Sequence, residues 1–181
     1  RWFTIFHLNH IKIILLNSNE NNLNDKNNNY TYLYEDFIKN KKSKFKFEDF
    51  DENTTATKFY TTGTTGDPKG VSYSHRQLII HTLGFIAGSS VSNFSHRFHN
   101  EDVYMPLTPM FHVHGWGFPY MATLLGVKQV YPGRYEPKKL LNLIIQEQVT
   151  FSHCVPTILQ MLLNENKKIK YDLSKLKLII G

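Results

Sequence analysis

The stretch YTTGTTGDPKGV, residues 60–71, combines hydroxyl side chains, glycines and one lysine. Residues 61–66 are four threonines and two glycines, and Lys69 follows three residues later. Backbone amides freed by glycine, hydroxyls and an ammonium group together form a site for anions. Such a loop has little side-chain area to bury and loses much entropy when it becomes ordered. The composition therefore favours a loop that binds a ligand over a loop that fills a core.

A Walker A loop and a plain hairpin turn are two other interpretations of this stretch. The Walker A pattern, G-x-x-x-x-G-K-[ST], fails twice when it is counted from Gly63. Pro68 stands at its second glycine, and Gly70 stands where a hydroxyl should bind magnesium. A plain hairpin turn stays open, although it has no use for so many hydroxyls beside Lys69.

The stretch PMFHVHGWGFPY, residues 109–120, places two histidines next to a tryptophan. His112 and His114 have the spacing of two zinc ligands, but no further ligands follow at the usual spacing, so we do not favour a metal site. A loop that packs its aromatic rings into a core also explains the composition. The residue types alone leave the core loop and a ligand pocket open.

Composition limits the class of protein. The chain has 181 residues, 41% of them hydrophobic, and a formal net charge of +6. That length can bury a sizeable core. The lysines are spread among acidic residues rather than clustered with aromatic residues in one stripe, which argues against a nucleic-acid module. Cys154 is the only cysteine, which suits a reducing compartment. The sequence starts at Arg1 and ends at Gly181 after an apolar run, so we expect a fragment.

The spacing of apolar residues and the positions of capping, proline and glycine residues predict alternating strands and helices. Strands are expected at 11–16, 56–62, 71–74, 103–107, 127–132, 149–154 and 176–181, with a strand running into a helix at 30–40. Ser74 should cap a helix, with Gln77 as its capping-box partner, and Gly88 and the serines after it should end that helix. Further helices should open at Pro137 and Pro156, and residues 116–125 form an apolar segment. Residues 17–29 form an Asn-rich loop. The alternation indicates an α/β fold with a mostly parallel sheet flanked by helices, with ligands beyond the carboxyl ends of its strands.

The loop at 60–71 resembles the phosphate-binding signature of the adenylate-forming enzymes, which include acyl-CoA synthetases, luciferases and peptide adenylation domains. The resemblance covers residues from about 30 to 181 and, more loosely, the strand at 11–16. It implies that residues 1–181 are part of the large N-terminal, AMP-binding domain, without the C-terminal domain. It also implies ATP, Mg²⁺ and coenzyme A as cofactors. The Asn-rich stretch has no counterpart in that family.

The resemblance assigns roles to the residues of the loop. Thr61 would reach magnesium and phosphate, and Lys69 would be a mobile phosphate contact and a candidate catalytic residue. The residues expected to wrap the β- and γ-phosphates are Thr62, Gly63, Thr64, Thr65 and Gly66. Magnesium, amides, hydroxyls and lysine would together offset the repulsion between a carboxylate and a triphosphate.

The segment at 109–120 resembles the second core motif of the family, in the form found in medium- and long-chain fatty acyl-CoA synthetases. By that resemblance His112 lies beside the reacting carboxylate, Val113 beside the nucleotide, and Trp116 gates the acyl tunnel. The segment HCVPT resembles a tunnel wall, which adds Val155, Pro156 and Thr157 as substrate contacts and makes Cys154 part of the pocket wall.

The implied function is ATP-dependent activation of a fatty acid, through an acyl-adenylate, to its CoA thioester, with the fragment itself nearly inactive. The alternatives are an aryl or coumarate-type CoA ligase and a non-catalytic nucleotide- or acyl-binding module. The expected partners are the fatty acid, ATP and CoA and no nucleic acid, with peripheral membrane contact and a homodimer left open. The expected location is the cytoplasm or the periphery of an intracellular membrane.

Overall fold

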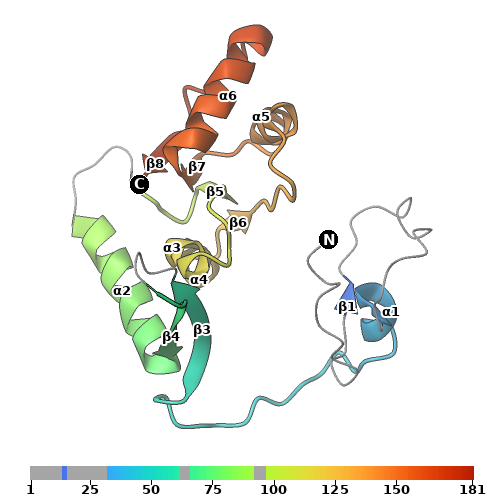
Figure 1. Cartoon of the computed structure of the whole chain (residues 1–181), viewed down its shortest axis with the longest axis vertical. Helices are drawn as coiled ribbons and strands as arrows, with labels where there is room; N and C mark the ends of the chain where they lie inside the picture. Colours follow the sequence, from blue (N-terminus) through green and yellow to red (C-terminus); the bar gives the residue numbers. More distant parts are fainter. Residues whose placement is uncertain (1–13, 16–31, 62–65, 92–96) are drawn as a thin grey trace. The chain divides into compact units, whose positions relative to one another are not determined.

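The computed structural model describes residues 14–15, 32–61, 66–91 and 97–181, and every structural statement below concerns these residues. They divide into two units, residues 1–49 and 50–181, which are described separately. Figure 1 shows the helices and strands along the chain. No helix in the described part of the chain has the length and apolar character needed to cross a membrane.

The first unit contains a short parallel pair of strands, β1 (Ile14–Leu15) and β2 (Tyr32–Leu33), and the helix α1 (Tyr34–Ile38). β1 lies inside the strand predicted at 11–16, and β2 runs directly into α1 as predicted for residues 30–40. The Asn-rich loop predicted at 17–29 lies outside the described residues.

The second unit begins with an antiparallel hairpin of β3 (Thr55–Thr61) and β4 (Lys69–Ser74), followed by the long helix α2 (His75–Val91). The loop predicted to bind phosphate therefore connects two paired strands. The strands on both sides of the loop form a hairpin, as in the alternative interpretation of this stretch. The predicted end of α2 at Gly88 and the serines after it was too early, because the helix continues through them to Val91. Glycine is tolerated inside a helix at a modest cost, and Ser89 Oγ donates a hydrogen bond to the Ile86 carbonyl in the turn that follows.

A four-stranded, all-parallel sheet in the order β6-β5-β7-β8 forms the centre of the second unit. The elements in chain order are β5 (Val103–Pro106), α3 (Val113–Trp116), α4 (Phe118–Leu124), β6 (Lys128–Gln129), α5 (Pro137–Gln146), β7 (Phe151–Cys154), α6 (Pro156–Ile169) and β8 (Lys177–Ile180). This sheet confirms the predicted parallel α/β architecture, and both predicted helix starts, Pro137 and Pro156, are correct.

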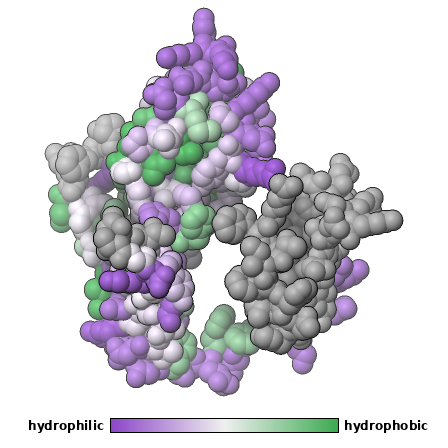
Figure 2. Space-filling view, viewed as in Figure 1, coloured by the Kyte–Doolittle hydropathy of each residue, from purple (hydrophilic) through white to green (hydrophobic). Residues whose placement is uncertain are grey.

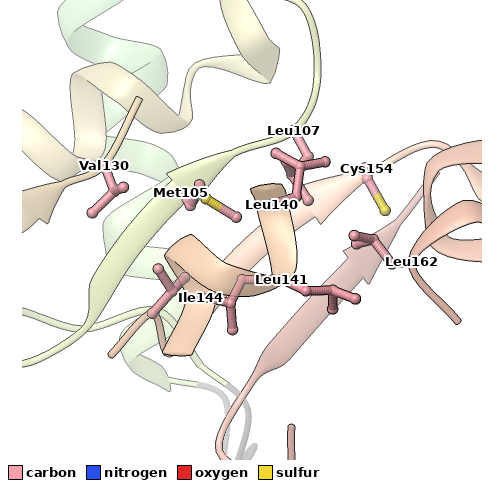
Figure 3. Close-up of a cluster of buried hydrophobic side chains, with 9 residues drawn as sticks. Met105, Leu107, Val130, Leu140, Leu141, Ile144, Cys154 and Leu162 are labelled. Carbon is pink, nitrogen blue, oxygen red and sulfur yellow. The ribbon is translucent and has the colours of Figure 1, made fainter. Parts of the chain in front are cut away.

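Helices cover both faces of this sheet, because successive strand residues point to opposite sides. On one face, side chains from β5 and β7 pack against α5 and α6; Figure 3 shows Met105, Cys154, Leu140, Leu141 and Leu162 converging there. On the other face, Tyr104 and Phe151 pack against Phe118 and Met121 of α4. The same alternation sends His153 to the α4 face and Cys154 to the α5 and α6 face.

The helix α2 exposes several large apolar side chains. Ile79, Ile80 and Leu83 are each more than half exposed. Figure 2 shows apolar patches where α2 lies, whereas the end of α6 is covered with hydrophilic side chains. The apolar side chains of α2 are therefore only partly buried, and Leu78 and Ile86 are half-buried.

Candidate active site

The β3–β4 hairpin places a hydroxyl and an ammonium group at the same end. Thr61 and Lys69 are paired across the hairpin as its last partners, and both side chains are exposed. Gly70, next to Lys69, lies close to the exposed Tyr60 ring, since an added Cβ would approach that ring to 3.3 Å. Thr62, Gly63, Thr64 and Thr65 lie outside the described residues, and Gly66 opens onto free space. The described donors fit an anionic phosphate, because a cation and a hydroxyl face solvent together.

A capping box at the start of α2 fixes the far end of this hairpin. The Ser74 backbone N–H donates to Gln77 Oε1 at 2.9 Å, and the Gln77 backbone N–H donates to Ser74 Oγ at 3.2 Å, as predicted. The strand β4 separates Lys69 from the helix, whereas in a Walker A loop the helix follows the lysine directly. The hairpin geometry therefore agrees with the rejection of that motif.

The segment around α3 is a left-handed turn. Residues 113–117 all have positive φ, and the values at Val113, His114 and Trp116 are 46°, 51° and 59°. Hydrogen bonds from Gly115 N to the His112 carbonyl, 3.0 Å, and from Gly117 N to the His114 carbonyl, 3.3 Å, close the turn. Left-handed helical geometry costs about 1–2 kcal/mol for each residue that has a Cβ. Backbone strain of this kind concentrates at functional sites.

This turn borders a cavity of about 300 Å³ in the second unit. The cavity is walled by the hairpin, α2, α3 and α4, through Phe59, Tyr73, Leu78, His81, Val113, His114, Trp116, Gly117 and Tyr120. Two predicted site residues, Val113 and Trp116, are therefore brought together, while His112 is exposed and does not line this cavity. Its walls are mostly aromatic and aliphatic, which suits an apolar ligand.

The sequence suggested His114 only as a possible metal ligand. In the structure its side chain instead contacts residues of β3. Its Nε2 lies 3.0 Å from Thr57 Oγ1, and its ring meets the Phe59 ring edge-on at 5.2 Å. The imidazole thereby joins the left-handed turn to β3 at the cavity wall. Its position two residues before Trp116 was the only signal that could have suggested this role.

The side chain of Trp116 lies over the carboxyl ends of β7 and β8. Its indole is 5.3 Å from the His153 ring, measured between ring centroids, and a Cβ built on Gly181 would lie 2.8 Å from Trp116 Cη2. The carboxyl ends of parallel strands are the usual place for ligands in α/β sheets, as predicted. Val155, Pro156 and Thr157 follow β7 at this end; Val155 is half-buried and the other two are exposed.

Cys154 is not at the cavity. It is fully buried in the cluster between the sheet and α5 and α6, so the prediction that it forms part of the pocket wall was wrong for this cavity. The strand alternation that turns His153 towards Trp116 turns Cys154 away. Burial raises the pKa of the Cys154 thiol, which agrees with the prediction that it is not a nucleophile.

The described residues contain no group of three or more His, Cys, Asp or Glu side chains placed to hold a metal ion. A magnesium ion at this site would therefore depend on oxygen ligands such as the Thr61 hydroxyl and the phosphates of a nucleotide. This donor set is ordinary for magnesium, which binds few protein groups when substrate phosphates are present.

Known proteins resemble this chain over most of its length. It is 44% identical over 126 residues to a long-chain-fatty-acid–CoA ligase from Thermus thermophilus, covering 67% of this chain and 22% of the ligase. It is 42% identical over 132 residues to a 3-methylmercaptopropionyl-CoA ligase from Ruegeria pomeroyi, covering 72% of this chain and 24% of that protein. The chain thus spans about a quarter of the length of these curated relatives.

A solved structure has the same fold. The O-succinylbenzoate coenzyme A synthetase from Bacillus subtilis, in complex with ATP and a magnesium ion, superposes with a TM-score of 0.62 at 25% identity, covering 84% of this chain and 30% of that protein. The model of one family, the AMP-binding enzymes, matches residues 9–181. The chain therefore belongs to the AMP-binding enzyme family, as its Thr- and Gly-rich loop and its aromatic–histidine segment had indicated.

Proposed function

We propose that the protein containing these residues activates a fatty acid with ATP and transfers the acyl group to coenzyme A. The observation that carries the proposal is the apolar cavity walled by Trp116, which borders the hairpin that presents Thr61 and Lys69. An apolar acid and a triphosphate would then meet between these two features. The identity to a long-chain-fatty-acid–CoA ligase supports the same substrate class.

Residues of the β3–β4 hairpin and its loop bind the phosphates of ATP in this reaction. The carboxylate oxygen attacks the α-phosphorus of ATP, pyrophosphate leaves, and an acyl-adenylate remains. Lys69 and Thr61 contact the phosphates, together with the loop residues Thr62, Gly63, Thr64, Thr65 and Gly66. Preorganised donors at this position offset the charge that would otherwise keep two anions apart. Mg²⁺, with Thr61 among its ligands, supplies further neutralisation when it is bound.

The left-handed turn and the segment after β7 bind the acyl group. Trp116 borders the acyl chain, His112 lies beside the reacting carboxylate, and Val113 lies beside the nucleotide. Val155, Pro156 and Thr157 extend the acyl wall from the carboxyl end of β7. In the second step the thiol of coenzyme A attacks the acyl carbonyl, the thioester forms, and AMP leaves.

Exchange of labelled pyrophosphate into ATP tests the proposal in the whole protein. Saturated fatty acids of increasing length should support exchange, and aryl acids such as coumarate should support much less. A non-catalytic nucleotide- or acyl-binding module would show no exchange with any acid. Exchange that depends on aryl acids and ignores fatty acids would contradict the proposed substrate class.

A short thioether acid is a second candidate, because the chain is almost as similar to a 3-methylmercaptopropionyl-CoA ligase as to the long-chain enzyme. The same exchange assay separates the two. Preference for 3-methylmercaptopropionate over octanoate and palmitate would favour the short acid. Preference that rises with chain length would favour the fatty acid.

The partners and the location follow from this chemistry. Fatty acids partition into bilayers, so we propose that the protein works in the cytoplasm or at the periphery of an intracellular membrane. A homodimer is also proposed, and sedimentation of the whole protein tests it. Flotation with vesicles containing oleate tests the membrane contact.

A further inference from the structure

His153 is a fully buried polar side chain with a partner on each ring nitrogen. Its Nε2 lies 2.6 Å from the Tyr104 hydroxyl, and its Nδ1 lies 2.8 Å from Thr108 Oγ1. All three side chains are almost completely inaccessible to solvent. A buried polar network of this kind holds its members in one arrangement because each lost hydrogen bond leaves a desolvated group.

The partners also determine the direction of the hydrogen bonds. Burial raises the pKa of Tyr104, so its hydroxyl keeps its proton and can either donate to Nε2 or accept from it. Thr108 Oγ1 donates to the His153 carbonyl at 3.5 Å, so its oxygen accepts from the Nδ1–H of His153, and Nε2 in turn accepts from the Tyr104 hydroxyl. Burial lowers the pKa of His153 to about 4, which keeps the imidazole neutral at neutral pH. The ring is therefore fixed in one tautomer and one orientation.

The faces of this fixed ring contact the aromatic residues of the site. Phe118 stacks on it at 4.5 Å with an interplanar angle of 19°, and Trp116 lies against it at 5.3 Å and 33°. The Gly181 backbone is so close to the indole that a Cβ there would collide with it. The indole of Trp116 is thereby confined between the His153 ring and the end of β8.

We propose that His153 is a positioning residue for Trp116, and that its ring determines how far the indole extends into the acyl cavity. The proposal rests on the function proposed above, and it adds a specificity determinant that does not itself touch the acid. A residue that only fills the core would affect stability without affecting the choice of acid.

Two substitutions separate the ring from its hydrogen bonds. His153→Gln keeps an acceptor and a donor but removes the aromatic face, and His153→Phe keeps the face but removes both hydrogen bonds. The KM for a long-chain acid should rise about two- to tenfold in His153→Gln, the range that one aromatic pair contributes. The KM for ATP should change little, and His153→Phe should stay closer to the unsubstituted protein.

Cys154→Ala is the matched control. Cys154 is the next residue on β7 and equally buried, but its side chain belongs to the cluster on the opposite face of the sheet. It should lower stability and leave the KM ratio of long to short acids unchanged. An equal change of that ratio in Cys154→Ala and His153→Gln would overturn the proposal, because it would mean that any loss of packing has this effect.

Fluorescence tests the positioning without activity. Trp2 and Trp116 are the two tryptophans of residues 1–181, so replacing every tryptophan of the whole protein except Trp116 by phenylalanine leaves Trp116 as the single reporter. In that background His153→Gln should shift the emission to the red and increase quenching by acrylamide, while Cys154→Ala should not. Tyr104→Phe, which removes one hydroxyl, should shift the emission in the same direction by less.

The outcomes separate this proposal from the proposed function. If the emission responds as expected but no fatty acid supports pyrophosphate exchange, the proposed function fails and the positioning of Trp116 stands. If exchange proceeds with fatty acids but His153→Gln changes neither the emission nor the KM ratio, the role of His153 is refuted.

Discussion

Thr61 and Lys69 are Cα partners at the open end of the β3–β4 hairpin, so the strand that enters the Thr- and Gly-rich loop pairs with the strand that leaves it. This pairing places the lysine at the loop without a following helix. The position of the charge is therefore determined by antiparallel register.

Lys69→Ala should lower the rate of ATP-dependent adenylation by about 10²–10³, the usual effect of removing one preorganised donor. The KM for the fatty acid should change much less, because the role proposed for Lys69 is to contact the phosphates. Initial rates at varied ATP and acid concentrations measure both. Lys58→Ala, an exposed lysine on the same hairpin opposite Ser72, should behave like the unsubstituted protein. A changed dependence on acyl length in Lys69→Ala would contradict the assignment.

Gly117→Ala should destabilise the chain. Gly117 has a φ of +78°, and an added Cβ would lie 2.9 Å from His81 Cε1. The left-handed backbone alone costs about 1–2 kcal/mol for alanine. Gly84→Ala is the control, since Gly84 lies inside α2 with open space around its Cβ position, and should stabilise by about 0.5–1 kcal/mol. Urea unfolding of the two variants should give shifts of opposite sign.

Asp102→Ala should cost about 3–5 kcal/mol of unfolding free energy, because it leaves the charge of Lys177 largely buried without its partner. Lys177 Nζ lies 2.6 Å from Asp102 Oδ1, and the Asp102 side chain is only 2% exposed. Glu147→Ala breaks the exposed pair with Lys128, 2.8 Å long, and should cost about 1 kcal/mol or less. Equal losses in chemical denaturation would show that the buried pair contributes no more than a surface pair.

Stability should fall in acid because His153 is buried in its neutral form. Its pKa is lowered to about 4 in the folded chain from the ordinary value of 6.5, so the unfolded chain binds more protons between these values. The contribution is complete above about pH 6.5 and is lost as the pH falls towards 4, by about 3 kcal/mol. His153→Gln should flatten the stability profile between pH 6.5 and 4. A profile of unchanged slope in this variant would assign the acid sensitivity to other groups.

The sequence was sufficient for the architecture because its signals are local. Pro137 and Pro156 marked the first turns of two helices, and Ser74 with Gln77 marked a third. Periodicity predicted the strands of the parallel sheet. It did not predict that β3 and β4 pair with each other, because pairing depends on the turn between them, whose glycines and threonines suit several geometries.

The site was less accessible from the sequence. Trp116 and Val113 were identified through a motif, and the structure brings both to one cavity. The roles of His114 and His153 depend on contacts with Thr57 and Tyr104, which are 57 and 49 residues away along the chain. No local pattern encodes such contacts. The positive φ values at Val113 and Trp116 were equally hidden, since neither residue type favours that region.

The strand order of the sheet has a consequence for biosynthesis. β5 occupies an inner position between β6 and β7, and its partners follow it later in the chain, with β7 starting at Phe151. During translation from the N-terminus, β5 leaves the ribosome before its neighbours β6 and β7 have been synthesised. Its apolar Tyr104 and Met105 therefore cannot yet be buried by the completed sheet. A nascent chain stalled before β7 would therefore leave these side chains exposed, as apolar surface is in incompletely folded chains.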